Sequence, residues 1–71
     1  MIMYDVEAVI PYCYPSGEVG SEWEDVFNVP QLKTEQAELQ KARQMAIVAR
    51  GFYTQVRIIK IQPGGLRSVV A

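Results

Sequence analysis

The feature that most constrains the fold is a single helix-forming segment, residues 34–50, between segments that favour β-strands. Thr34 suits the N-cap position, acidic residues occupy the first turn, and Gly51 follows where a left-handed residue commonly ends a helix. At about 100° per residue, one thin, alanine-rich stripe gathers Leu39, Ala42, Met45, Ala46 and Ala49. One such helix can cover only one face of a small sheet.

Three segments have the residue pattern of strands. Residues 4–12 alternate between apolar and acidic side chains, and residues 52–61 are rich in β-branched ones. Residues 22–28 are expected to return antiparallel to the first strand, after a loop of turn-forming residues at 15–21. Pro11 cannot donate a ladder hydrogen bond, so the first strand should end or bulge there.

The predicted fold is α+β, with the order ββαβ in a single domain of residues 1–71. We expect a three-stranded antiparallel sheet with the first strand in the centre and one α-helix across one face. On the second strand, Trp23 and Phe27 should share one face and Val26 should lie on the other. Residues 66–71 are expected to form a short mobile tail.

The composition argues against catalysis. There is no histidine, which removes the usual general base near neutral pH and the commonest metal ligand. The one cysteine, Cys13, has no partner for a disulfide and no adjacent base, so we interpret it as a buried or half-buried structural thiol. We therefore predict no catalytic, cofactor-binding or metal-ligating residue, and a protein that is not an enzyme.

No membrane partner is expected. No apolar run approaches the roughly 20 residues needed to span a bilayer, and the first residues lack the basic start of a signal peptide. A single cysteine also suits a reducing compartment. We expect a cytoplasmic protein.

The net charge of −1 hides a strong separation of charge along the chain. Residues 1–38 contain eight acids and one base, a net of −7, whereas residues 39–71 contain six bases and no acid. One interpretation is internal, with strand pairing that sets Asp5 and Glu7 near Arg57 and Lys60. Another is a nucleic-acid-binding domain that uses the basic C-terminal half, although a pI of about 5.2 makes direct nucleic-acid binding unexpected.

Four acids around the predicted hairpin have no basic neighbour in sequence: Glu18, Glu22, Glu24 and Asp25. Such a cluster can dock on the basic surface of another protein through long-range attraction, with Trp23 as an anchor. The alternative is a solvated strand edge that resists aggregation, with Trp23 in the core or on the sheet.

The last predicted strand suggests a second contact surface. Tyr53, Arg57, Ile59 and Ile61 share one of its faces, which would form an apolar and aromatic patch if the helix does not cover it. If the helix does cover it, Val56 and Ile58 face outward instead. A partner protein or a second copy of the chain, as in a homodimeric accessory subunit, could bury either face.

The layout resembles that of small phage-encoded proteins, including inhibitors of host RNA polymerase and some anti-CRISPR proteins. The resemblance spans residues 4–61. It rests on an opening strand at Tyr4–Val9, an acidic second strand with a tryptophan at Glu22–Phe27, an alanine-rich helix at residues 34–50 and a closing segment at Arg50–Ile58. It carries over no functional residue. It implies a small non-catalytic protein–protein interaction module that binds and blocks a host protein machine.

Overall fold

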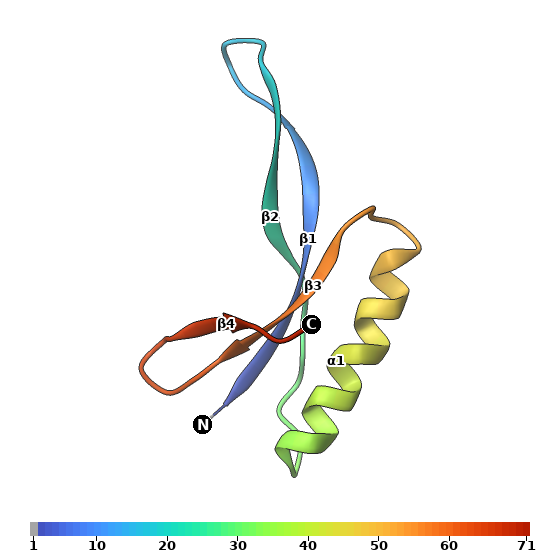
Figure 1. The fold of residues 1–71 in the computed structure, drawn as a ribbon, viewed down its shortest axis with the longest axis vertical. Coiled ribbons are helices and arrows are strands. Elements are labelled where there is room, and N and C mark those ends of the chain that lie inside the picture. The colour runs from blue at the N-terminus through green and yellow to red at the C-terminus, as the bar shows by residue number, and fades with distance from the viewer. Residues whose placement is uncertain (1) are drawn as a thin grey trace.

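The computed structural model describes residues 2–71 and arranges them as a four-stranded antiparallel sheet with one helix (Figure 1). The elements are β1 Met3–Cys13, β2 Val19–Asn28, α1 Glu35–Arg50, β3 Val56–Ile61 and β4 Arg67–Val69. The strand order is β2-β1-β3-β4. The predicted α+β class and the central position of the first strand are confirmed, whereas the prediction of three strands was wrong.

The helix begins and ends where it was predicted, but the conformation of its C-terminal cap differs. Thr34 is the N-cap, with an extended backbone, and its hydroxyl accepts a hydrogen bond from the Ala37 N–H at 3.1 Å. Gly51 has a φ of −73°, so the expected left-handed residue is absent from this position. Its N–H instead donates to the Val48 carbonyl at 3.1 Å, a tighter turn that satisfies the end of the helix.

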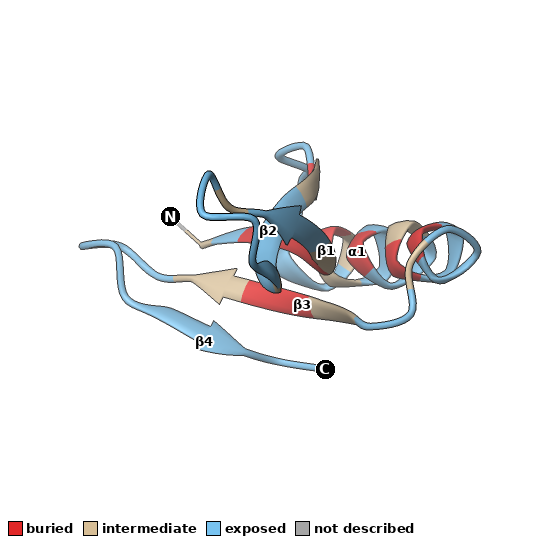
Figure 2. Ribbon diagram, turned by 90° about the horizontal axis from the view of Figure 1, so that it is seen from above, coloured by how far each residue is buried: buried red, intermediate tan, exposed pale blue. Residues whose placement is uncertain are grey.

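The core lies between α1 and the two strands it crosses, β1 and β3 (Figure 2). The three alanines of the stripe on α1 are buried and pack against Tyr4 and Val6 of β1 and Ile58 of β3, while Leu39 and Met45 are partly buried. Because alanine side chains are small, the helix can approach the sheet closely. The face of β3 that carries Ile58 is therefore the covered one, and the face that carries Arg57 is not. We call the uncovered side of the sheet the open face.

A β-bulge divides β2 into two parts. Val6 pairs with Phe27 but Glu7 pairs with Asp25, so Val26 is the additional residue. The bulge reverses the alternation, which places Phe27 on the helix side while Trp23 stays on the open face. The prediction that these two aromatic residues share a face was wrong, because a one-residue insertion leaves no clear signature in sequence.

The predicted mobile tail is a strand. Pro63 and Gly64, with a φ of 91° at Gly64, form a tight turn that Gly65 completes. The Gln62 N–H then donates to the Leu66 carbonyl at 2.9 Å, and β4 pairs with β3 through Ile59↔Val69 and Ile61↔Arg67. Pairing continues to the last residue, since the Ile58 N–H donates to the Ala71 carbonyl at 2.8 Å.

Three strand boundaries also differ from the predicted ones. β1 continues through Pro11 to Cys13, and β2 begins at Val19, within the expected loop. β3 begins at Val56, so residues 52–55 belong to the connection that follows the helix. The first two changes lengthen the hairpin, and this extra length shapes the candidate site.

Candidate protein-binding surface

The most prominent feature outside the core is a two-stranded extension of the β1–β2 hairpin (Figure 1). β3 pairs with β1 only as far as Ala8, and the Val9 N–H makes one further hydrogen bond, to the Gln55 carbonyl at 3.1 Å. Residues 9–23, which we call the hairpin arm, continue past α1 and β3. The radius of gyration is accordingly 13.6 Å, against about 11 Å for a compact chain of this length.

A rigid turn closes the tip of the arm. The Gly17 N–H donates to the Tyr14 carbonyl and the Tyr14 N–H donates to the Glu18 carbonyl, both at 2.9 Å. Pro15 restricts φ at the second position of this turn, and Gly17 has a φ of 89°, which glycine adopts at little cost. The turn therefore fixes the register of the two strands.

Two tyrosines organise one face of the arm. The rings of Tyr12 and Tyr14 meet edge to face, with 4.8 Å between their centroids. The Tyr14 hydroxyl donates to Glu22 Oε1 at 3.0 Å, and this hydrogen bond raises the pKa of Tyr14. Its ring lies over Gly20, where an added Cβ would stand 2.8 Å from the ring. Glycine at this position lets the tyrosine cross from one strand to the other.

The predicted acidic residues have different surroundings. Glu18 and Glu22 are exposed on the arm and Glu24 is exposed at its base, and within residues 2–71 none of them forms an ion pair. Asp25, in contrast, lies 3.6 Å from the Arg67 guanidinium. The acidic cluster available to a partner is therefore smaller than predicted, because Arg67 belongs to the strand that we had expected to be a mobile tail.

Trp23 lies on the open face at the base of the arm. Its side chain is partly exposed, and the Arg57 guanidinium stacks over its ring at 4.0 Å from the centroid. This cation–π contact across the sheet holds the indole in place.

The structure does not assemble the patch that we predicted on the last long strand. Arg57 lies on the open face, one of the two arrangements considered, but Ile59 is only 3 % exposed. Ile59 pairs with Val69 of β4, the strand that was not predicted. Tyr53 precedes β3 and packs against the core.

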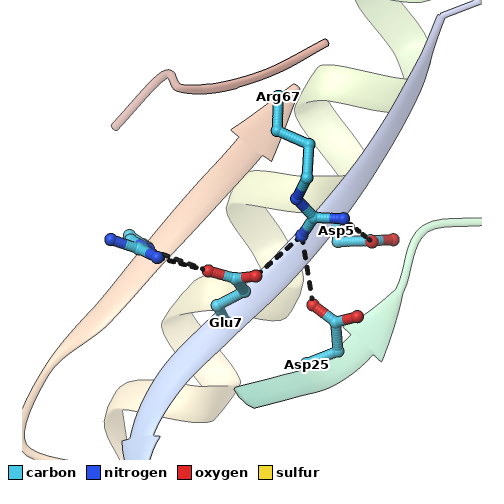
Figure 3. A network of polar contacts seen from close by, with 5 residues as sticks. Asp5, Glu7, Asp25 and Arg67 are labelled. Atoms are coloured by element: carbon cyan, nitrogen blue, oxygen red, sulfur yellow. Dashed lines mark hydrogen bonds and ion pairs between the residues drawn. The ribbon is translucent and has the colours of Figure 1, made fainter. Parts of the chain in front are cut away.

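An ion-pair network occupies the open face instead (Figure 3). Glu7 accepts hydrogen bonds from Arg57 at 2.8 Å and from Arg67 at 2.7 Å. Arg67 also lies 4.0 Å from Asp5 and 3.6 Å from Asp25, so it connects residues from β1, β2 and β4. The predicted pairing of Glu7 with Arg57 is confirmed.

The two buried acids of this network respond to it in opposite directions. Burial alone would raise the pKa of Glu7, but the hydrogen bond from Arg57 and the two guanidinium charges bring it below its ordinary value. Burial also raises the pKa of Asp5, and the nearby Asp25 and Glu7 add to this effect beyond what Arg67 offsets. The site holds more acid than its two arginines neutralise.

Lys60 lies on the helix side, not beside Asp5 as expected. Its ammonium group is 3.2 Å from Glu35 Oε1, which also accepts a hydrogen bond from the Tyr4 hydroxyl at 2.8 Å. The hydrogen bond from Tyr4 and, after it, the contact with Lys60 lower the pKa of Glu35. Burial and the same hydrogen bond raise the pKa of Tyr4 to about 12.

Strand pairing and the packing of α1 on the sheet together neutralise half of the basic C-terminal charge. Arg57, Lys60 and Arg67 contact acids of the N-terminal half. Among residues 2–71, the bases beyond residue 38 that form no ion pair are all on the helix: Lys41, Arg43 and Arg50. The exposed charges without an ion pair therefore include an acidic set on the arm and a basic set on the helix.

The remaining features of the described chain are a surface depression and the exposed cysteine. A shallow depression of about 260 Å³ between β2 and α1 is lined by Phe27, Lys41, Gln44, Met45 and Val48. Across residues 2–71, no three His, Cys, Asp or Glu side chains gather where they could hold a metal ion. In the same span, no helix combines the length and apolar character needed to cross a bilayer. Cys13 is exposed on the arm, so the interpretation as a buried or half-buried thiol was wrong.

Sequence reasoning missed the tyrosine pair and Arg67 as parts of this surface. The spacing of Tyr12 and Tyr14, two residues apart on a strand, is a signal that places both on one face. Arg67 gave no comparable signal, because its position depends on the turn at Pro63 and Gly64.

Comparison with protein-family models, curated proteins and solved structures finds no match to this chain.

Proposed function

We propose that this chain is a non-catalytic protein-binding module that uses the hairpin arm to engage a basic surface of another protein. The single observation that supports this most is the arm itself, a ribbon that leaves the core and carries exposed apolar, aromatic and acidic side chains. Isolated two-stranded hairpins are marginally stable in water, so a long arm with Val19 80 % exposed is costly unless a partner covers it.

Charge gives the class of partner. Residues 9–23 contain no basic side chain, and the exposed acids Glu18, Glu22 and Glu24 would attract a basic surface from a distance. The resemblance to phage inhibitors suggests a more specific role, in which the module blocks a host protein machine. Direct nucleic-acid binding is less favoured, because three of the six C-terminal bases already contact acids of the same chain.

Charge reversal on the arm tests the proposal. Affinity capture with the wild-type chain should retain a stoichiometric protein partner, and Glu18→Lys/Glu22→Lys/Glu24→Lys should lose it while its circular dichroism spectrum stays unchanged. Asp25 is left intact because its reversal would disrupt the contact with Arg67. The matched control Lys41→Glu/Arg43→Glu/Arg50→Glu changes the helix surface by the same number of charges and should keep the partner. Equal capture by the wild-type chain and the arm variant would contradict the proposal.

A further inference from the structure

The outer edge of β2 is the longest free strand edge in residues 2–71. β2 lies at one end of the sheet and has ten residues, whereas β4 at the other end has three. A free edge presents unpaired backbone N–H and C=O groups to which an extended peptide can add as a further strand.

The backbone groups that face outward can be assigned from the hydrogen bonds of the arm. In an antiparallel pair, alternate residues direct N–H and C=O toward the partner strand. The Tyr14 N–H donates to the Glu18 carbonyl, and Gly20 and Glu22 follow with the same parity in the register. Val19, Ser21 and Trp23 therefore direct their backbone groups away from β1, toward the free edge.

The other edge of the arm is poorly suited to strand addition. The Val9 N–H already donates to the Gln55 carbonyl, and Pro11, two residues further on the same edge, has no N–H. This position also explains why β1 continues through a proline, since the missing donor faces away from β2. Of the two edges of the arm, the one on β2 retains consecutive outward donors.

Side chains along β2 define the strand that would fit there. Glu22 and Glu24 lie on one face, two residues apart, while Val19 and Trp23 lie on the other. A neighbouring strand with basic and apolar residues in alternation would place its cations beside the glutamates and its apolar side chains beside Val19 and Trp23. A second copy of β2 would place glutamates near glutamates, so like-charge repulsion disfavours self-pairing.

We propose that the arm binds its partner by β-strand addition, with the free edge of β2 pairing to an extended partner segment of alternating basic and apolar residues. The inference rests on the proposed function and specifies the chemistry of the partner. The outward backbone groups of Val19, Ser21 and Trp23 supply the hydrogen bonds, and the exposed glutamates select the segment.

Amide exchange tests this with a defined probe. We would titrate the ¹⁵N-labelled chain with a short peptide of alternating lysine and valine and measure exchange residue by residue. Exchange at Val19, Ser21 and Trp23 should slow roughly tenfold at saturation, while Gly20 and Glu22, already paired with β1, should change little. The same peptide N-methylated on the residues that face β2 keeps its charge and should bind roughly tenfold more weakly.

Two controls separate charge from strand pairing. Glu18→Gln/Glu22→Gln/Glu24→Gln should weaken binding roughly tenfold at low ionic strength, and the helix variant Lys41→Gln/Arg43→Gln/Arg50→Gln should not. Equal affinity for the N-methylated peptide, unchanged exchange at the three outward amides, or the absence of binding would overturn strand addition. A chain that self-associates in light scattering at the same concentration, with those amides protected without peptide, would overturn the assignment to a basic partner.

The outcomes for the two proposals are distinguishable. If arm charge reversal abolishes partner capture but the outward amides do not respond to the peptide, the protein-binding function stands and strand addition fails. If capture is insensitive to arm charge, the proposed function fails first.

Discussion

Replacement of Glu7 by glutamine probes the network that joins all four strands. The Glu7 side chain is only 10 % exposed and accepts hydrogen bonds from Arg57 at 2.8 Å and Arg67 at 2.7 Å. Glutamine has a similar shape but no charge, and its amide group would meet one guanidinium as donor against donor. The Glu7→Gln variant should therefore lose one arginine contact and weaken the other.

The expected loss of stability in Glu7→Gln follows from the exposure of the two arginine side chains that contact Glu7. Hydrogen bonds to charged groups contribute about 1.5–3 kcal/mol, and exposed ion pairs about 0.2–1 kcal/mol. Because the Arg57 and Arg67 side chains are 30 % and 45 % exposed, solvent screens both, and values near the lower end apply. We expect the free energy of unfolding to fall by about 2 kcal/mol, which lowers Tm by roughly 8–16 °C in a domain of this size.

The pH dependence gives a second test of the same substitution. The pKa of Glu7 is lower in the folded chain than its ordinary value of 4.5, so its stabilising effect is present above pH 4.5 and is lost as the pH falls through the folded pKa. The difference between wild type and variant should be full at pH 7 and should shrink in more acidic solution.

Urea and thermal denaturation, followed by circular dichroism at several pH values, measure both effects. Glu18→Gln is the matched control, because this glutamate is exposed and its replacement should change the free energy of unfolding by less than about 0.5 kcal/mol. A Glu7→Gln variant as stable as that control at pH 7, or a destabilisation that persists unchanged in acid, would refute the assigned role of the network.

Two further substitutions test the titratable groups around the core. Asp5→Asn should raise Tm at pH 7. Burial and the neighbouring carboxylates raise the pKa of Asp5, so the folded chain disfavours the ionised form of this side chain. The gain in Tm should vanish in acid, where the wild-type aspartate is protonated in both the folded and the unfolded state. Tyr4→Phe should lower the free energy of unfolding by about 1 kcal/mol at neutral pH through loss of the hydrogen bond to Glu35. Because the pKa of Tyr4 is about 12 in the folded chain, the free energy of unfolding of the wild type should decline as the pH rises above the ordinary tyrosine pKa of 10.0. Denaturation at alkaline pH should show a weaker decline for Tyr4→Phe.

The part of the fold that sequence predicted correctly rests on local signals. Thr34 identifies the start of the helix and the alanine stripe identifies its buried side, both within a few residues of chain. The central position of β1 followed from one helix linking a hairpin to a later strand. These features depend on periodicity and on the chemistry of caps.

The parts of the fold that we did not predict depend on single residues that change the positions of residues distant in the sequence. The bulge at Val26 moves Phe27 to the helix side, and the turn at Pro63–Gly64 turns a predicted tail into β4. Arg67 then lies beside Asp25, which we had grouped with the acids that have no basic neighbour. β4 also pairs with β3 at Ile59, a residue that we had assigned to an exposed patch. The surroundings of Asp25 and Ile59 therefore depend on contacts with β4, which no short-range sequence pattern predicts.

The arm combines exposure with internal order, and this combination favours binding. A flexible loop with the same side chains would lose conformational entropy when it bound, at a cost of about 0.5–1.5 kcal/mol for each side chain immobilised. In this chain, the turn at Gly17 fixes the register, Tyr14 bridges to Glu22 across Gly20, and Arg57 holds Trp23 at the base. The outward edge of β2 is thus already in the extended conformation that an added strand requires, so more of the interaction energy remains available as affinity.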